Sequence, residues 1–111
     1  RSTEKIIGYY TLTYGSIAYA EATEEVKKGM PKYPIPVMIL ARLAVDKNYK
    51  GLGIGAGLLK NAICRTIQAS EIAGLRAMIS HAKDENAKRF YAYHGFQSSH
   101  LDNYHMMITI K

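Results

Sequence analysis

Residues 48–59 read NYKGLGIGAGLL, and in this stretch every second position from 51 to 57 is a glycine. A glycine inside a helix or strand costs roughly 0.5–1 kcal/mol relative to alanine, so four of them together need a physical reason. The apolar run VMILARLAV at 37–45 precedes the stretch and predicts a central strand buried on both faces. An amphipathic pattern follows it and predicts a helix over about 55–73. The glycines therefore lie where a strand ends and a helix begins.

The start of a helix can bind an anion when nothing blocks it. About four backbone N–H groups there lack a partner within the helix, and the end carries roughly half a unit of positive charge. Glycine has no Cβ to obstruct these N–H groups and permits the turns that aim them at a ligand. The glycines therefore favour a phosphate-binding site, to which Lys50 would add positive charge.

Two common phosphate-binding motifs do not account for the glycines. The nucleotide-hydrolase motif G-x-x-x-x-G-K-S/T is absent, because Gly-Lys-Ser and Gly-Lys-Thr do not occur. The dinucleotide fingerprint can be placed on Gly51, Gly53 and Ala56. It also requires an acidic residue at the end of the next strand, and LRAMISHA at 75–82 has none.

The remaining pattern predicts one small α/β domain over residues 1–111. Strands are expected at 5–14, 16–20, 37–45, 75–82 and 103–111, and helices at 21–30, 55–73 and 84–94. This β-β-α-β-α-β-α-β order predicts a mixed sheet with helices packed on it. Gly15 is expected to form a turn after the first strand, and Pro34 and Pro36 to lie outside any strand ladder.

The two longer helices carry clear boundary signals. Leu59, Ile63 and Ile67 predict the buried face of the first, and Gly74 its end. Cys64 lies in the same helix and is expected to be a small buried hydrophobe. In the second helix, Asp84 is expected to cap the N-terminus, and Gly95 to end it in a left-handed conformation.

Composition narrows the partners and the compartment. The net charge is +6 and the pI is about 9.5, which favours an anionic partner such as nucleic acid or a phosphorylated cofactor, or merely reflects a basic surface. The single cysteine cannot form an intramolecular disulfide and suggests a reducing compartment, the cytoplasm. The four histidines show no metal-ligand spacing, so we expect no metal, and no apolar run predicts a membrane span. The chain begins with Arg1 and enters a strand almost at once, so we expect an N-terminal truncation.

Two motifs resemble those of the GNAT N-acetyltransferases. KGLGIG at 50–55, after RLAVD at 42–46, resembles the acyl-CoA loop of that superfamily, R/Q-x-x-G-x-G/A. AKRFYAYHGF at 87–96 resembles its second signature, A-x-x-x-Y-x-x-x-G-F. The two occur in the family's order with a predicted strand between them. The resemblance implies the GNAT α/β (α+β) fold, with a mixed central sheet flanked by helices.

One branch of the superfamily resembles nearly the whole chain from about residue 7. GYYTL at 8–12 and PIPVMILARLAVD at 34–46, together with the glycine loop and the tyrosine helix, are similar to the GNAT toxins of type II toxin–antitoxin modules. These acetylate the amino group of aminoacyl-tRNA and so block translation. The family starts with a further strand and one or two helices that this chain lacks.

The resemblance implies an acetyl-CoA site on three segments. Its residues would be Leu43, Ala44, Val45, Lys50, Gly51, Leu52, Gly53, Ile54, Gly55, Ala56, Asp84, Asn86 and Ala87. The edge of strand 43–45 would pair with the pantetheine arm, and the N–H of Val45 would polarise the thioester oxygen. The backbone N–H groups of 51–56 would bind the pyrophosphate. Lys50 replaces the family's Gln or Arg, and Asp84 stands where many relatives have an Asn that contacts pantetheine.

Tyr91 is the expected catalytic residue, as the acid that protonates the leaving thiolate. A phenol of pKa about 10 can donate to a thiolate whose conjugate acid is near 8.5 at modest cost. The alternative is that Tyr91 only packs in the core beside Phe90. The sequence offers no convincing general base, which favours an α-amino acceptor, since its pKa of about 7.7–8.0 leaves it partly neutral.

Three functions remain open at this point. The first is a toxin that acetylates charged tRNA, whose phosphates could contact the basic residues Lys27, Lys28, Lys32, Lys47, Lys83, Lys88 and Arg89. The second is an acetyltransferase for a protein N-terminus, a polyamine or another small amine. The third is a non-catalytic remnant that binds acyl-CoA or an antitoxin. The resemblance further implies a DNA-binding antitoxin and a homodimer as partners.

Overall fold

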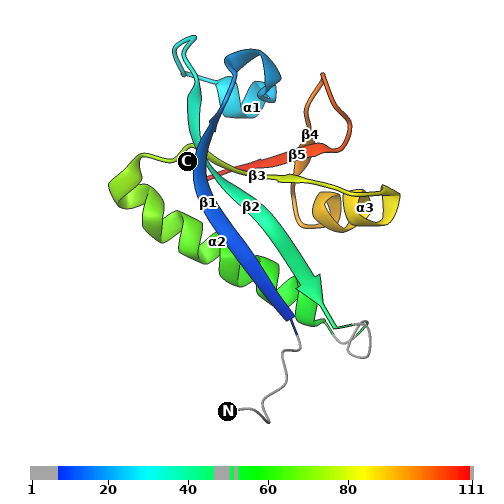
Figure 1. The fold of residues 1–111 in the computed structure, drawn as a ribbon. Coiled ribbons are helices and arrows are strands. Elements are labelled where there is room, and N and C mark those ends of the chain that lie inside the picture. Colours follow the sequence, from blue (N-terminus) through cyan, green and yellow to red (C-terminus); the bar gives the residue numbers. More distant parts are fainter. Residues whose placement is uncertain (1–7, 47–50, 52, 111) are drawn as a thin grey trace.

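The structure is a computed structural model that describes residues 8–46, 51 and 53–110. In chain order the elements are β1 (Gly8–Ile17), the 3-10 helix η1 (Tyr19–Glu21), α1 (Glu24–Lys27), β2 (Ile35–Val45), α2 (Ile54–Ala73), β3 (Ala77–His81), α3 (Glu85–Tyr93), β4 (Gln97–Ser98) and β5 (His105–Thr109). The strands form one sheet in the order β1-β2-β3-β5-β4 (Figure 1). Only β2 and β3 run parallel. The mixed sheet flanked by helices confirms the predicted fold class.

The N-terminal half departs from the sequence prediction at three places. Gly15 lies inside β1 opposite Val37, so it forms no turn, and residues 16–20 form no second strand. The predicted helix at 21–30 shortens to α1, which Thr23 caps and which ends before Gly29 in a left-handed conformation (φ 76°).

Pro36 lies within the β1–β2 ladder, opposite Ser16, where the sequence predicted it outside. Proline removes only the N–H donor. Its carbonyl still accepts a hydrogen bond from the backbone N–H of Arg76 (2.9 Å). Near the start of β2 the lost donor is therefore tolerated.

Side chains alternate between two cores on opposite faces of the sheet. Along β3, Met78 packs with residues of α2 and α3, whereas Ala77 and Ile79 pack with Ala22 and Val26 around η1 and α1. The face under α2 and α3 also buries Tyr91. One sheet therefore separates a surface covered by the two long helices from a surface that η1 and α1 cover only in part.

Helix α2 matches its prediction in length but not in its buried stripe. It ends at Gly74, which has the predicted left-handed conformation (φ 70°). Its buried residues are Leu59, Ala62, Thr66 and Ser70. Ile67 is 43% exposed and Cys64 is exposed, so the prediction of a buried cysteine is wrong. The helix can turn Thr66 inward because its hydroxyl donates to the carbonyl of Ala62 (2.8 Å).

The C-terminal third follows the predicted order and adds one short strand. Helix α3 ends at Tyr93, and Gly95 adopts the predicted left-handed conformation (φ 98°). The N–H of Phe96 then donates to the carbonyl of Tyr91 (3.0 Å), and the Phe96 side chain is buried. The unpredicted β4 pairs with Met106 and Met107 of β5, which hold it in the sheet.

Candidate active site

Strand β2 separates from β3 partway along its length (Figure 1). The two strands pair in parallel only between Val37–Ile39 and Ala77–Ile79. Beyond Ile39, the described part of β2 pairs only with β1, and the register of that ladder shifts by one residue at Ala41. The edge of β2 that faces β3 therefore has no strand partner over residues 40–45. An extended ligand could form hydrogen bonds with this backbone, as an added strand would.

The burial of β2 changes at the same point. Five of the six residues from Ile35 to Leu40 line one of the two cores at less than 9% exposure or pack against it, whereas Ala41 and Arg42 are exposed and Leu43 to Val45 are half-buried. The expectation that the whole of 37–45 is buried on both faces is therefore wrong after Leu40. The cause is the separation from β3, which leaves one side of the strand open.

Helix α2 begins directly beyond this open edge with backbone N–H groups that no side chain caps. Gly53 is the N-cap in a left-handed conformation (φ 80°), and Gly51 has φ 85°, so these two glycines serve the predicted turn. The first bond to the cap runs from the N–H of Gly57 to the carbonyl of Gly53 (3.1 Å). The N–H groups of 54–56 precede that bond and point out of the helix end. Lys50 and Leu52 lie outside the described residues.

Gly55 joins the three segments of the predicted site. A methyl group built on Gly55 would lie 3.7 Å from Cγ2 of Val45 and 3.8 Å from Cζ of Phe90. The start of α2, the end of β2 and the middle of α3 therefore meet at one place. On the other side, a Cβ on Gly8 would lie 2.9 Å from Cδ1 of Leu58, so β1 and α2 pack closely because this glycine has no side chain. The structure thus brings together segments that the sequence predicted to act together.

Tyr91 is buried in the core beneath this opening. Its side chain is 7% exposed and belongs to the same cluster as Leu40, the first residue of β2 beyond its pairing with β3. The ring contacts Phe90 and Phe96 edge-on or tilted, at centroid distances of 5.4 and 5.2 Å. Its hydroxyl makes no hydrogen bond to any residue that the structure describes. Packing therefore accounts for the ring but not for the phenol oxygen.

The start of α3 places the other predicted residues. The Asp84 carboxylate caps the helix by accepting from the N–H of Ala87 (2.8 Å), as predicted. The side chain of Asn86 is exposed and accepts from Nη2 of Arg89 (2.6 Å). Ala87 is half-buried and packs against the core that contains Tyr91.

Replacing Asp84 by Ala is expected to lower the free energy of unfolding by about 1 kcal/mol, because the N–H of Ala87 loses its acceptor. Asp84→Asn is the matched control, since asparagine caps helices about as well as aspartate. Denaturant unfolding of both variants measures the difference. Equal stabilities would show that the cap bond contributes nothing. If Asp84 also contacts a ligand, only the alanine variant should lose affinity for it.

A pair of histidines escaped the sequence analysis. His81 on β3 and His105 on β5 are cross-strand partners, and their rings stack with centroids 4.4 Å apart. Burial, together with the neighbouring His81, lowers the pKa of His105 below its usual value. The signal was available in part: His105 opens the apolar run HMMIT, at an inward position of a strand. Its partner could not be read from the sequence, and no cluster of three metal-binding side chains occurs among the described residues.

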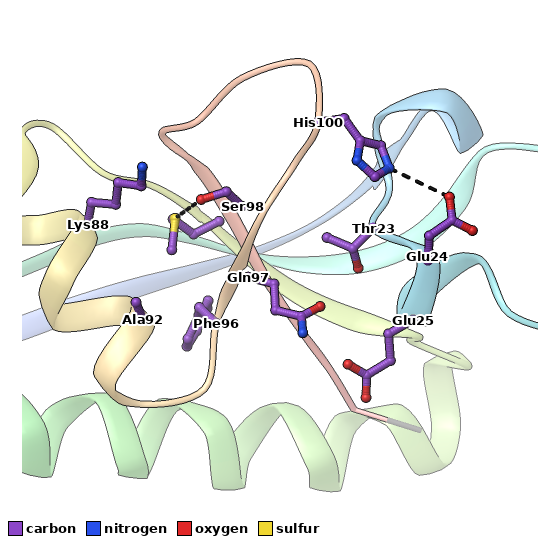
Figure 2. Close-up of a pocket in the computed structure, with 10 residues that line it drawn as sticks. Thr23, Glu24, Glu25, Lys88, Ala92, Phe96, Gln97, Ser98 and His100 are labelled. Atoms are coloured by element: carbon purple, nitrogen blue, oxygen red, sulfur yellow. Dashed lines mark hydrogen bonds and ion pairs between the residues drawn. The ribbon is translucent and has the colours of Figure 1, made fainter.

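A cavity of about 650 Å³ lies away from the strand opening (Figure 2). Residues from α1, α3, β4 and the β4–β5 loop line it, among them Glu24, Lys88 and His100. Nε2 of His100 lies 3.7 Å from a Glu24 carboxylate oxygen, and the Ser98 hydroxyl contacts the sulfur of Met106 (3.2 Å). No residue of the predicted acetyl-CoA site lines this cavity, so we assign it no part in that site.

Residues 2–98 match the model of a protein family described as the acetyltransferase (GNAT) domain. The chain belongs to the GNAT acetyltransferase family. In GNAT terms, the predicted fold, the glycine loop and the tyrosine helix are all on the matched segment. No described helix is both long and apolar enough to cross a membrane.

Known GNAT proteins of one kind resemble the chain along most of its length. It is 42% identical over 107 residues to the tRNA-acetylating toxin of Mycobacterium tuberculosis (strain ATCC 25618 / H37Rv), covering 96% of this chain and 64% of that protein. A solved structure of AtaT complexed with acetyl-methionyl-tRNAfMet aligns with a TM-score of 0.85 at 28% identity, over 93% of this chain and 62% of that one. A tyrosine-to-phenylalanine mutant of AtaT bound to the C-terminus of the antitoxin AtaR and acetyl-CoA aligns with a TM-score of 0.76 at 27% identity. That alignment covers 94% of this chain and 59% of that one. The chain therefore spans about three fifths of the length of these relatives.

Proposed function

We propose that the protein is a toxin that transfers the acetyl group of acetyl-CoA to the α-amino group of aminoacyl-tRNA and so blocks translation. The observation that carries this proposal is the open edge of β2, which ends beside the uncapped N-terminus of α2. The relative named tRNA-acetylating toxin and the AtaT structure with acetyl-methionyl-tRNAfMet support the choice of acceptor. GNAT membership supports the reaction class.

The residues present fit acetyl-CoA without rearrangement. The backbone of Leu43, Ala44 and Val45 lies on the open edge and would hold the pantetheine arm, with the N–H of Val45 directed to the thioester oxygen. The N–H groups of 51–56 would hold the pyrophosphate, with Lys50 beside them. No side chain built at Gly51 or Gly53 would meet another atom within 4 Å, so the approach to these positions is open. Acetyl-CoA supplies the acetyl group as a thioester.

Tyr91 is the proton donor in this proposal. Its phenol oxygen has no hydrogen-bond partner in the described part of the chain, and the ring is held in place by Phe90 and Phe96. A group with one locked orientation and one unused donor suits proton transfer at a fixed position. Asp84, Asn86 and Ala87 stay predicted contacts of the pantetheine arm. Asn86 would first have to release Arg89.

Basic side chains on and around α3 would contact the tRNA. Lys83 and Arg89 are exposed, as are Lys28 and Lys32 near α1. Two others are already engaged: Lys27 lies 3.8 Å from a Glu24 oxygen, and the amine of Lys88 lies over the ring of Tyr104. Lys47 lies outside the described residues. The exposed four are therefore the better candidates for phosphate contacts, which depend on salt concentration.

An antitoxin and a second copy of the chain are the proposed protein partners. The AtaT structure bound to the C-terminus of AtaR supports the first. The resemblance expects this antitoxin to bind DNA and the toxin to form a homodimer. With charged tRNA as substrate, the cytoplasm is the proposed site of action.

Incubating the intact gene product with labelled acetyl-CoA and total charged tRNA tests the proposal. We expect label on one or a few aminoacyl-tRNA species, in an ester-linked form that mild base releases from the tRNA. Label on protein N-termini or on spermidine instead would replace the acceptor and keep the enzyme class. No transfer to any amine, with coenzyme A still bound, would favour the non-catalytic alternative.

A further inference from the structure

A second cavity lies on the face of the sheet opposite α2 and α3. Its volume is about 530 Å³, and its walls come from the end of β1, η1, the middle of β2, β3 and the β4–β5 loop. Its lining is mixed: apolar side chains such as Ile39 and Ile79 form the floor, and Glu21, His81, Asp102 and His105 form polar walls. None of the residues assigned above to acetyl-CoA lines it.

This cavity borders the opening between β2 and β3. Ile39 and Ile79 are the last paired residues of the two strands, and both line the cavity. His81 lies two residues farther along β3, so it points to the same face as Ile79, about 7 Å beyond the point where the strands part. Its cross-strand partner His105 lies beside it. The two imidazoles therefore face the opening from the side opposite Tyr91.

His105 carries a nitrogen with an unmet requirement. Its side chain is 8% exposed, and Nε2 is a buried atom that lacks a hydrogen-bond partner among the described residues. More than 90% of buried polar groups have a partner, so an unsatisfied one in a cavity wall indicates a missing ligand. A neutral imidazole has one nitrogen that accepts a hydrogen bond. The missing group is therefore a donor if His105 is neutral.

The surrounding groups favour a neutral imidazole in a cavity that attracts cations. Burial and the stacked ring of His81 lower the pKa of His105, while Glu21 on η1 and Asp102 in the β4–β5 loop act in the opposite direction. Nε2 of His81 lies 3.8 Å from a carboxylate oxygen of Asp102. Two carboxylates and one neutral base suit a primary ammonium group, which donates hydrogen bonds and carries positive charge.

We propose that this cavity receives the ammonium group of the acceptor and that His105 Nε2 accepts one of its protons before the amine attacks. The proposal rests on the proposed function and supplies the general base that the sequence did not reveal. The amine nitrogen forms a bond to the thioester carbon, and the carbon–sulfur bond breaks. Of the three ammonium protons, one passes to His105 and on to water along the exposed His81. A second replaces the proton that Tyr91 gives to the sulfur, and the third stays on the amide.

Replacing His105 by Gln tests the base in the intact gene product. We measure kcat/KM for the aminoacyl-tRNA that the wild type acetylates, between pH 6 and 9. At pH 6.5 we expect a loss of about 100-fold, since a glutamine can accept a hydrogen bond but not the proton. The loss should shrink as the pH rises above the acceptor's own pKa, because the amine then arrives already neutral. Affinity for coenzyme A should not change.

His100→Gln is the matched control, because His100 lies in the same loop region but lines the other cavity and is 53% exposed at its side chain. It should keep the wild-type rate and pH profile. A rate for His105→Gln equal to that of the wild type, or a loss of the same size at every pH, would overturn the proposal. The second outcome would assign His105 a structural role.

A separate titration keeps the proposal distinct from the choice of acceptor. Alanine methyl ester, a small α-ammonium probe, should shift the imidazole NMR signals of His105 in the wild type and leave those of His100 unchanged. If the wild type acetylates a different amine, the proposed function fails, and the same two variants are then compared on that amine. No shift of the His105 signals at any probe concentration would sink the inference.

Discussion

Tyr91→Phe is expected to lower kcat for acetyl transfer by about 10²- to 10⁴-fold, the usual contribution of a positioned proton donor. The substitution removes only the phenol oxygen, which has no hydrogen-bond partner in the described chain. The ring stays in its place between Phe90 and Phe96. We therefore expect unchanged unfolding temperature and unchanged affinity for coenzyme A, as measured by calorimetry.

Tyr93→Phe provides the matched control for this experiment. Tyr93 lies two residues away on the same helix and is 85% exposed, so it faces away from the core that holds Tyr91. Removal of its hydroxyl should change kcat by less than about twofold. If Tyr91→Phe retained full activity, the packing interpretation of this residue would be correct and the thiolate would take its proton from elsewhere.

Gly53→Val is expected to weaken binding of coenzyme A at least tenfold. Valine is strained at φ 80°, at a cost of about 1–3 kcal/mol, and relief of that strain would turn the first N–H groups of α2 away from the opening. Loss of one charge-assisted hydrogen bond to the pyrophosphate costs roughly 1.5–3 kcal/mol, and about 1.4 kcal/mol is tenfold in affinity. Isothermal calorimetry with coenzyme A measures the change.

Gly74→Val separates the strain from the ligand contact. Gly74 ends the same helix with φ 70°, and a Cβ at either glycine would meet no other atom within 4 Å. Both variants should therefore lose similar unfolding free energy, whereas only Gly53→Val should lose affinity for coenzyme A. Equal affinities in the two variants would mean that the N-terminus of α2 does not hold the pyrophosphate. If valine prevents folding, the alanine pair gives the same comparison with less strain.

Features fixed by neighbours in the sequence were predictable. Gly53, Gly74 and Gly95 occur at the helix boundaries where they were expected, because a left-handed residue or a cap depends on only about four residues on either side. The cap at Asp84 follows the same logic. The two family motifs also depend on short spacings, so the family itself could be identified before any coordinates.

The burial of individual helix faces was less predictable. The apolar spacing of Leu59, Ile63 and Ile67 located α2, but the sheet buries Thr66 and leaves Ile67 and Cys64 exposed. Periodicity identifies a stripe within about one residue position, which is 100° of helix rotation. The actual rotation is chosen by the partner surface, here β1 and β2, and by the bond that lets Thr66 be buried.

The sequence by itself determined the strand–glycine–helix unit, the capped tyrosine helix and the family, because each depends on residues close together in the chain. Tertiary structure alone decided where β2 leaves β3 and which residues face that opening. It also brought His81 beside His105, 24 positions later. Such pairings join residues that are distant in the chain, and their energy comes from packing and hydrogen bonds that exist only once the sheet has formed.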